Sequence, residues 1–197
     1  GNNHEAIYNL NKTILTTIRE AGAVNNIFVA CGNNYSQEGT RWDPRAVTVE
    51  QSFILSKGEE LVKYNQDNWG NNHIVFSPHF YRIWVHGDAK MADFIDKCYD
   101  RNFPLICGEY GIRTPGGDCT PATKSIVRVG YPRQIGRSVW HWTGGDWNDL
   151  VTSGNGRART LQVDASGNPS GLTWLGKVVW DDNHREEELE MITDVLP

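Results

Sequence analysis

Helical and strand-like hydrophobic patterns alternate along the chain. Between Glu5 and Ala21, apolar residues recur every three or four positions, as in an amphipathic helix, and Gly22 ends the pattern. Four short, mostly apolar runs follow at wide intervals, each of the kind that predicts a buried strand. These runs are Ile27–Cys31, Ile74–Phe76, Pro104–Cys107 and Ser138–Trp142.

Helical patterns fill the segments between the apolar runs. Short strands separated by helices are typical of a parallel sheet with helices on its faces, so the pattern predicts an α/β fold. Four such strands are too few for a complete eight-stranded barrel, which takes about 250 residues. No glycine-rich phosphate-binding motif follows any strand, which disfavours a nucleotide site. The expected helices lie near Val47–Tyr64, Ala89–Tyr99 and Pro121–Val129, followed by a hairpin at Leu161–Ser170 and a helix from about Leu172.

Composition and charge narrow the functional classes. The 197 residues carry a net charge of −5 without a cluster of Lys and Arg, which disfavours a nucleic-acid partner. No apolar run approaches the roughly 18 residues that a membrane-spanning helix needs, so we expect no membrane partner. Eight Trp are a high number for this length. They are consistent with a large aromatic core or with a carbohydrate site in which indole faces stack on sugar rings.

The four cysteines do not have the spacing of a zinc site, because no two of them form a Cys-x-x-Cys pair. Cys31 and Cys107 lie in apolar runs, so we expect buried, free thiols at both positions. The cysteines therefore do not point to a metal site, and the mechanism implied below by the family resemblance needs neither a metal nor an organic cofactor.

Glu109 is the strongest candidate for a catalytic residue. It comes just after a predicted buried strand, where a carboxylate is costly unless a partner or a reaction uses it. Gly108 and Gly111 flank it and would allow a ligand to approach closely. A salt-bridged or helix-capping glutamate is the structural alternative.

His79 and Tyr81 are two residues apart after the second strand, so both side chains should point to the same side. A His and a Tyr level with Glu109 on the next strand could orient its carboxylate by hydrogen bonds. A histidine satisfied within the core is the alternative. Trp140 and Trp142 also share one side of their predicted strand. They could be platforms for sugar rings or part of the hydrophobic core. The loop 146–149 could contact substrate or simply form a turn.

Taken together, these segments resemble glycoside hydrolase family 5, the retaining cellulases and mannanases with a (β/α)8 barrel. The matching stretches look like the fifth to eighth strands of that barrel, in order, so the resemblance implies an α/β fold that is the C-terminal portion of a TIM barrel. Residues 1–197 would then form one partial catalytic domain that lacks the N-terminal strands. The stretches are 25–34 with Trp42 downstream, Val75–Tyr81, Pro104–Gly111 and Ser138–Trp142.

The resemblance implies a role for each matching residue. Glu109 matches the nucleophile of the family, and His79 and Tyr81 match the His-x-Tyr pair that contacts substrate and nucleophile. Trp140 matches the aromatic residue beneath the sugar at the cleavage site. The remaining implied substrate-binding residues, which would extend the cleft, are Trp42, Trp142 and Trp147.

One part of the family pattern is not found in this sequence. The acid/base Glu of the family lies in an Asn-Glu-Pro motif, whereas the chain begins Gly-Asn-Asn-His-Glu, and Glu5 is followed by Ala6. We therefore expect the 197 residues alone to be inactive, and expect the partner to be the missing N-terminal half of the barrel or a second copy of the chain.

The resemblance implies part of a secreted, retaining endo-β-1,4-glycanase. It would hydrolyse cellulose or mannan through a glycosyl-enzyme on Glu109, without a cofactor. The alternative is a non-catalytic carbohydrate-binding α/β module, which would keep the Trp platforms and have no use for Glu109.

Overall fold

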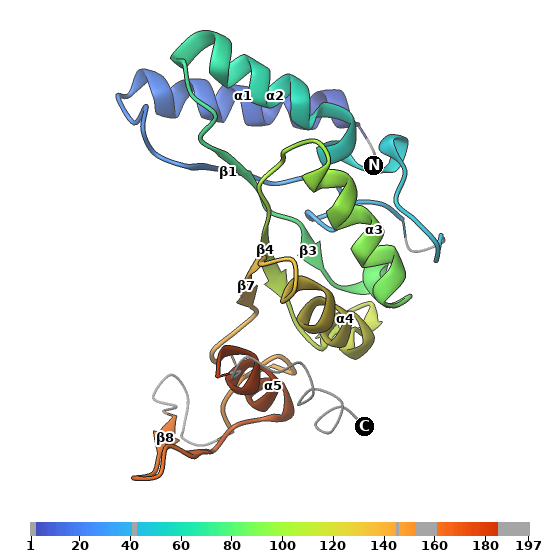
Figure 1. Ribbon diagram of the computed structural model, residues 1–197, viewed down its shortest axis with the longest axis vertical. Coiled ribbons are helices and arrows are strands. Elements are labelled where there is room, and N and C mark those ends of the chain that lie inside the picture. The colour runs from blue at the N-terminus through green and yellow to red at the C-terminus, as the bar shows by residue number, and fades with distance from the viewer. Residues whose placement is uncertain (1–2, 41–42, 145, 153–160, 185–197) are drawn as a thin grey trace.

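The computed structural model describes residues 3–40, 43–144, 146–152 and 161–184. Four helices alternate with short parallel strands, and a fifth helix follows near the C-terminal end (Figure 1). The α/β alternation that the hydrophobic pattern predicts is confirmed. The helices are α1 (His4–Glu20), α2 (Phe53–Trp69), α3 (Asp88–Tyr99), α4 (Thr120–Gly130) and α5 (Trp174–Asn183), with 3-10 turns η1 (Val49–Gln51) and η2 (Arg82–Trp84).

Short parallel strands run through the centre of the molecule in chain order. β1 (Phe28–Ala30) pairs with β2 (Ile74–Phe76). β3 (His79–Phe80) pairs with β4 (Ile106–Tyr110), which pairs with β7 (Gly136–Val139). A bridge from Phe76 to Leu105 joins the two groups of strands. Because the pairings of β3 with β4 and of β4 with β7 are both parallel, the carboxyl ends of these three strands meet at one edge.

Capping side chains decide where the first two helices begin. Asn3 accepts the backbone N–H of Ala6 at the start of α1, and Ser52 accepts that of Leu55 at the start of α2. The predicted helix at 47–64 is therefore wrong at both ends, because Ser52 starts α2 and Gly70, in the left-handed region, ends it.

The buried core lies between the helices and one face of the strands. Phe80, Trp84 and Phe94 pack with ring centroids 5.0–5.1 Å apart and connect β3 to α3. The opposite face of the strands is more open. In β1, Phe28 and Ala30 are buried, whereas Val29 between them is 50% exposed. The chain therefore presents an apolar position on the side of the sheet that faces away from the helices.

Two strand predictions need correction, and one short strand, β3, was not predicted. Ser77 and Pro78 separate β3 from β2, because Pro78 has no N–H for a ladder. β4 continues past Cys107, so Glu109 lies within the strand and not after it. β7 ends at Val139, before the two Trp residues assigned to it.

The cysteine prediction is confirmed in part. All four cysteines are free thiols, and Cys107 is buried. Cys31, by contrast, is exposed, because β1 ends at Ala30 and the residue belongs to the following loop.

Two hairpins and α5 complete the described chain. The first hairpin pairs β5 (Arg113–Thr114) with β6 (Gly117–Asp118), and the second pairs β8 (Gln162–Val163) with β9 (Pro169–Ser170). The second hairpin and α5 were predicted, although α5 begins two residues later than expected. Among the described helices, none is long and apolar enough to cross a membrane.

Candidate active site

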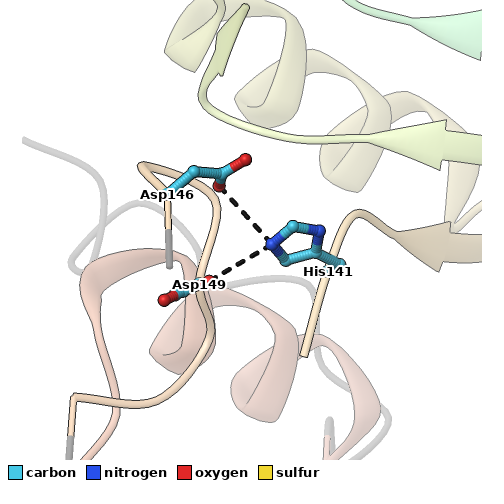
Figure 2. Close-up of side chains that lie close together, drawn as sticks. All are labelled: His141, Asp146 and Asp149. Carbon is cyan, nitrogen blue, oxygen red and sulfur yellow. Dashed lines mark hydrogen bonds and ion pairs between the residues drawn. The ribbon is translucent and has the colours of Figure 1, made fainter. Parts of the chain in front are cut away.

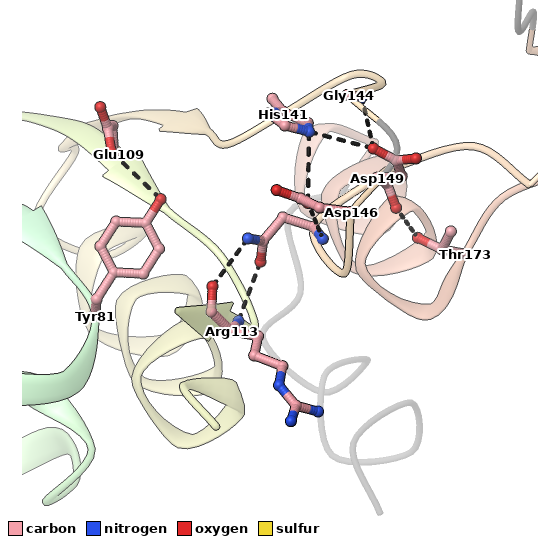
Figure 3. A network of polar contacts seen from close by, with 9 residues as sticks. Tyr81, Glu109, Arg113, His141, Gly144, Asp146, Asp149 and Thr173 are labelled. Carbon is pink, nitrogen blue, oxygen red and sulfur yellow. Dashed lines mark hydrogen bonds and ion pairs between the residues drawn. The ribbon is translucent and has the colours of Figure 1, made fainter. Parts of the chain in front are cut away.

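Glu109 lies level with His79 across the β3–β4 pairing, as the sequence predicts. The hydroxyl of Tyr81 donates a hydrogen bond to Oε2 of Glu109 at 3.4 Å (Figure 3). Nδ1 of His79 lies 3.5 Å from the same oxygen. Two polar side chains from β3 and the residue after it thus converge on one carboxylate oxygen. Oε1 has no hydrogen-bond partner among the residues that the structure describes.

Burial fixes the protonation of both neighbours. It lowers the pKa of His79, an effect that the charge of Glu109 partly opposes, so the imidazole is mostly neutral at pH 7. Burial and the nearby Glu109 carboxylate both raise the pKa of Tyr81 above its usual value, which keeps the phenol a hydrogen-bond donor. The two described side chains that lie against Oε2 of Glu109 are therefore neutral and polar.

A cavity of about 920 Å³ lies over this group, at the carboxyl ends of the strands. This is the edge where α/β sheets and barrels place their sites. Its size and its mixture of aromatic and polar side chains suit an extended organic ligand. The residues that line the cavity include Glu109, His79, Tyr81, Trp140, Trp147, Asp146, Asn148, Arg113, Tyr35 and Gln37.

The Trp residues proposed from the sequence separate into three groups. Trp140 and Trp147 both line the cavity, and Trp147 also stacks with the guanidinium of Arg113, which lies 4.8 Å from its ring centroid. Trp142 is half-exposed and does not line this cavity, and its role in extending the cleft stays a prediction. Trp42 lies outside the described residues.

Sequence reasoning missed the side chains that shape the far end of the cavity. Asn148 donates to the carbonyl of Arg113 and accepts its backbone N–H, which fastens the loop after β7 to the β5–β6 hairpin. A side chain at Gly111 would collide with Asn148, so this close approach requires a glycine. The Pro115-Gly116 pair was the available signal for the hairpin, since such dipeptides mark turns.

His141, Asp146 and Asp149 form a second polar cluster beside the cavity (Figure 2). One potential ligand atom from each lies within 4.8 Å of the others, so this is the group among the described residues that could hold a metal ion. Nε2 of His141 lies 3.2 Å from Asp149 and 3.5 Å from Asp146. The backbone N–H of Gly144 also donates to Asp149, at 2.7 Å. These contacts hold in place the turn that carries Trp147, and this structural role accounts for the cluster.

Comparison with known proteins adds to this geometry. The family model described as Cellulase (glycosyl hydrolase family 5) matches residues 1–146. A β-mannanase/endoglucanase A from Caldicellulosiruptor saccharolyticus is 27% identical over 143 residues, which cover 73% of this chain and 9% of that protein.

Solved β-mannanases resemble the chain in fold. The catalytic domain of a mannanase from Streptomyces sp. SirexAA-E aligns with a TM-score of 0.57 and 19% identity over 85% of this chain. The β-mannanases of Streptomyces thermolilacinus and Thermomonospora fusca align with TM-scores of 0.55 and 0.54, at 19% and 18% identity, over 72% and 77% of it.

The chain spans only part of these proteins. It covers 42–46% of the three structural neighbours. At this identity the likeness shows the fold alone, an α/β fold that corresponds to part of a TIM barrel. The match of the family model over most of the chain is what shows the relationship, and the chain therefore belongs to glycosyl hydrolase family 5.

Proposed function

We propose that this chain is part of a retaining endo-β-1,4-glycanase that hydrolyses a plant polysaccharide, cellulose or mannan, with Glu109 as the nucleophile. The observation that supports this most is the convergence of His79 and Tyr81 on Oε2 of Glu109, which lines a cavity of about 920 Å³ and whose Oε1 has no hydrogen-bond partner among the described residues. The relatives described as mannanases and endoglucanases agree with a β-1,4-linked substrate. An enzyme meets a plant polysaccharide outside the cell, so we propose that the protein is secreted.

In this proposal Oε1 of Glu109 attacks the anomeric carbon while a carboxylic acid protonates the departing glycosidic oxygen. The C–O bond to the leaving sugar breaks as the bond to Glu109 forms. Water, deprotonated by the same acid/base group, then attacks the anomeric carbon and releases Glu109. Tyr81 and His79 hold the carboxylate in line for attack, and the indole of Trp140 stacks beneath the sugar ring.

The second carboxyl group must lie about 5–5.5 Å from the first in a retaining enzyme. Asp146 also lines the cavity, but one of its oxygens already faces His141 and accepts the backbone N–H of Asn148 at 2.7 Å. We therefore propose that the acid/base group comes from polypeptide outside these residues, and that the 197 residues alone have little or no activity.

We propose further that the described strands are the fifth to eighth of a (β/α)8 barrel, and that an N-terminal half or a second copy completes the barrel. The half-exposed Val29 in β1 supports this, because a closed barrel would bury such a position. Light scattering combined with mass spectrometry of every polypeptide in the particle tests the proposal. A 22.2 kDa monomer that unfolds cooperatively at micromolar concentration would contradict it.

The catalytic role is tested with Glu109→Ala in the intact protein. We expect kcat on a β-1,4-linked glycan to fall by several orders of magnitude. Azide should restore part of the turnover of an activated aryl glycoside by attacking the anomeric carbon in place of Glu109. Asp146→Asn is the matched control, since it changes another carboxylate of the same cavity, and it should respond to azide no more than the wild-type protein does.

The same variants separate the proposal from the alternative of a carbohydrate-binding module. A module without catalysis would bind oligosaccharides equally well with Glu109→Gln and would show no turnover in any form. Wild-type turnover in Glu109→Ala would exclude Glu109 as the nucleophile.

A further inference from the structure

Glu38 is a completely buried carboxyl group that the proposed reaction does not use. It belongs to the loop 33–39, which follows β1, and its two oxygens have different partners. Oε1 accepts the backbone N–H of Asn33 at 3.0 Å, within the loop. Oε2 accepts the hydroxyl of Ser52 and the backbone N–H of Ile54, at the N-terminus of α2. Glu38 thus ties the two ends of the loop together and attaches both to the positive end of a helix dipole.

The backbone of the loop depends on this attachment. Asn34, Tyr35 and Ser36 have consecutive φ values of 54–61°, a left-handed conformation that non-glycine residues rarely adopt. Such a conformation persists only where the surroundings over-determine it. The Glu38 carboxylate also fills the space next to Gly32, where a Cβ atom would collide with Oε1. The carboxylate is therefore the internal support around which the loop turns.

The opposite side of the loop contacts the proposed active site. The carbonyl of Ser36 accepts the backbone N–H of His79 at 2.7 Å, and the hydroxyl of Ser36 donates to the carbonyl of Ser77 at 2.8 Å. The loop therefore fixes the backbone of His79, and with it the position from which the imidazole faces Glu109.

We propose that Glu38 is a positioning residue of the active site: through the loop 33–39 it holds the carbonyl of Ser36 against the backbone N–H of His79 and so fixes the position of the imidazole beside Glu109. The inference rests on the proposed function only for its consequence in catalysis.

Glu38→Gln in the intact protein is the direct test. Both oxygens of Glu38 accept from donors, so the amide of Gln must place its N–H₂ against one of them and lose that bond. The backbone amide and the ring nitrogens of His79 are then observed by ¹⁵N–¹H correlation NMR, without substrate. We expect shifted His79 signals in Glu38→Gln, because the carbonyl of Ser36 is no longer held against the backbone N–H of His79, together with a fall in kcat of about tenfold, as for the loss of one net hydrogen bond.

Asn65→Ala is the matched control. Like Glu38, Asn65 is a fully buried polar residue, and it lies on α2. Its side chain bonds to Arg19 and Asn71, which do not belong to the loop 33–39. It should destabilise the protein without changing the ring signals of His79. Unchanged His79 signals in a folded Glu38→Gln protein would overturn the inference.

Gly32→Ala provides a second variant if Glu38→Gln does not fold, because it displaces the carboxylate and leaves its chemistry intact. It should shift the His79 signals in the same direction, and unchanged signals would again overturn the inference. The NMR result also separates this inference from the proposed function. Shifted His79 signals in a protein that hydrolyses no glycan would reject only the proposed function, whereas unshifted signals in an active hydrolase would reject only the role of Glu38.

Discussion

Tyr81→Phe removes a single oxygen atom from the group around Glu109. The ring of Tyr81 is 7% exposed and keeps its packing in this variant, so the change isolates the hydrogen bond to Oε2. Because burial keeps the phenol protonated, the bond that is lost runs from a neutral donor to a carboxylate.

A hydrogen bond to a charged group contributes about 1.5–3 kcal/mol. The O–O distance of 3.4 Å is long for such a bond, which places this one at the low end of the range. At about 1.4 kcal/mol for each factor of ten, kcat should fall by about tenfold. KM should change little, because the hydroxyl acts on Glu109. The loss should be far smaller than that of Glu109→Ala, since Tyr81 orients the carboxylate and forms no bond to the sugar.

Steady-state kinetics of the intact protein on a β-1,4-linked oligosaccharide measure this effect. Tyr99→Phe is the matched control. Tyr99 lies on α3 and does not line the cavity, and its hydroxyl donates to the carbonyl of Arg133 at 3.0 Å. It should reduce stability and leave kcat unchanged. If Tyr81→Phe keeps the full kcat, or loses no more than Tyr99→Phe, the hydrogen bond to Glu109 has no part in the reaction.

Three further predictions concern buried charges. Asp182→Ala should lower the free energy of unfolding, measured by urea titration, by about 3 kcal/mol. The variant leaves the mostly buried guanidinium of Arg137 without the carboxylate that it binds at 2.7–2.9 Å. A loss below about 1 kcal/mol would contradict this prediction. Burial raises the pKa of Glu38 from 4.5 to about 7, so its contribution to stability should fall by about 3 kcal/mol as pH rises through this interval, and Glu38→Gln should remove that slope. Lys90→Met should cost about 3 kcal/mol by thermal unfolding, because the buried Nζ donates to three backbone carbonyls, and an unchanged midpoint would refute the role of this lysine.

The sequence predicted the central part of the site because its geometry follows from local rules. His79 and Tyr81 are two positions apart, and parallel strands in sequential order place the next strand level with them. The meeting of these residues with Glu109 therefore needed only the strand assignments. The ends of the strands were harder to predict, because they depend on pairing partners. β4 extends to Tyr110 since β3 and β7 supply partners there, although Gly108 and Glu109 have low intrinsic strand propensity.

The features that were missed are made by contacts between distant segments. Asn148 and Arg113 are 35 residues apart, and no periodicity relates them. The burial of Glu38 depends on the N-terminus of α2, 14 residues later, so a charged residue in a polar loop gave no sign of its position. Trp142 was assigned to a strand whose last residue is Val139. Side chains alternate between the two faces of a sheet only within a strand, so the rule could not place Trp142.

The most direct test of the central claim is the identity of the residue that carries the glycosyl-enzyme. The intact protein would be incubated with an activated 2-deoxy-2-fluoro-β-glycoside, which slows both chemical steps and allows the intermediate to accumulate, and the labelled peptide would be sequenced by mass spectrometry. We predict one glycosyl group per active site, attached to Glu109, and no label in Glu109→Gln. A label on another carboxylate, or equal labelling of the Glu109→Gln protein, would contradict the account.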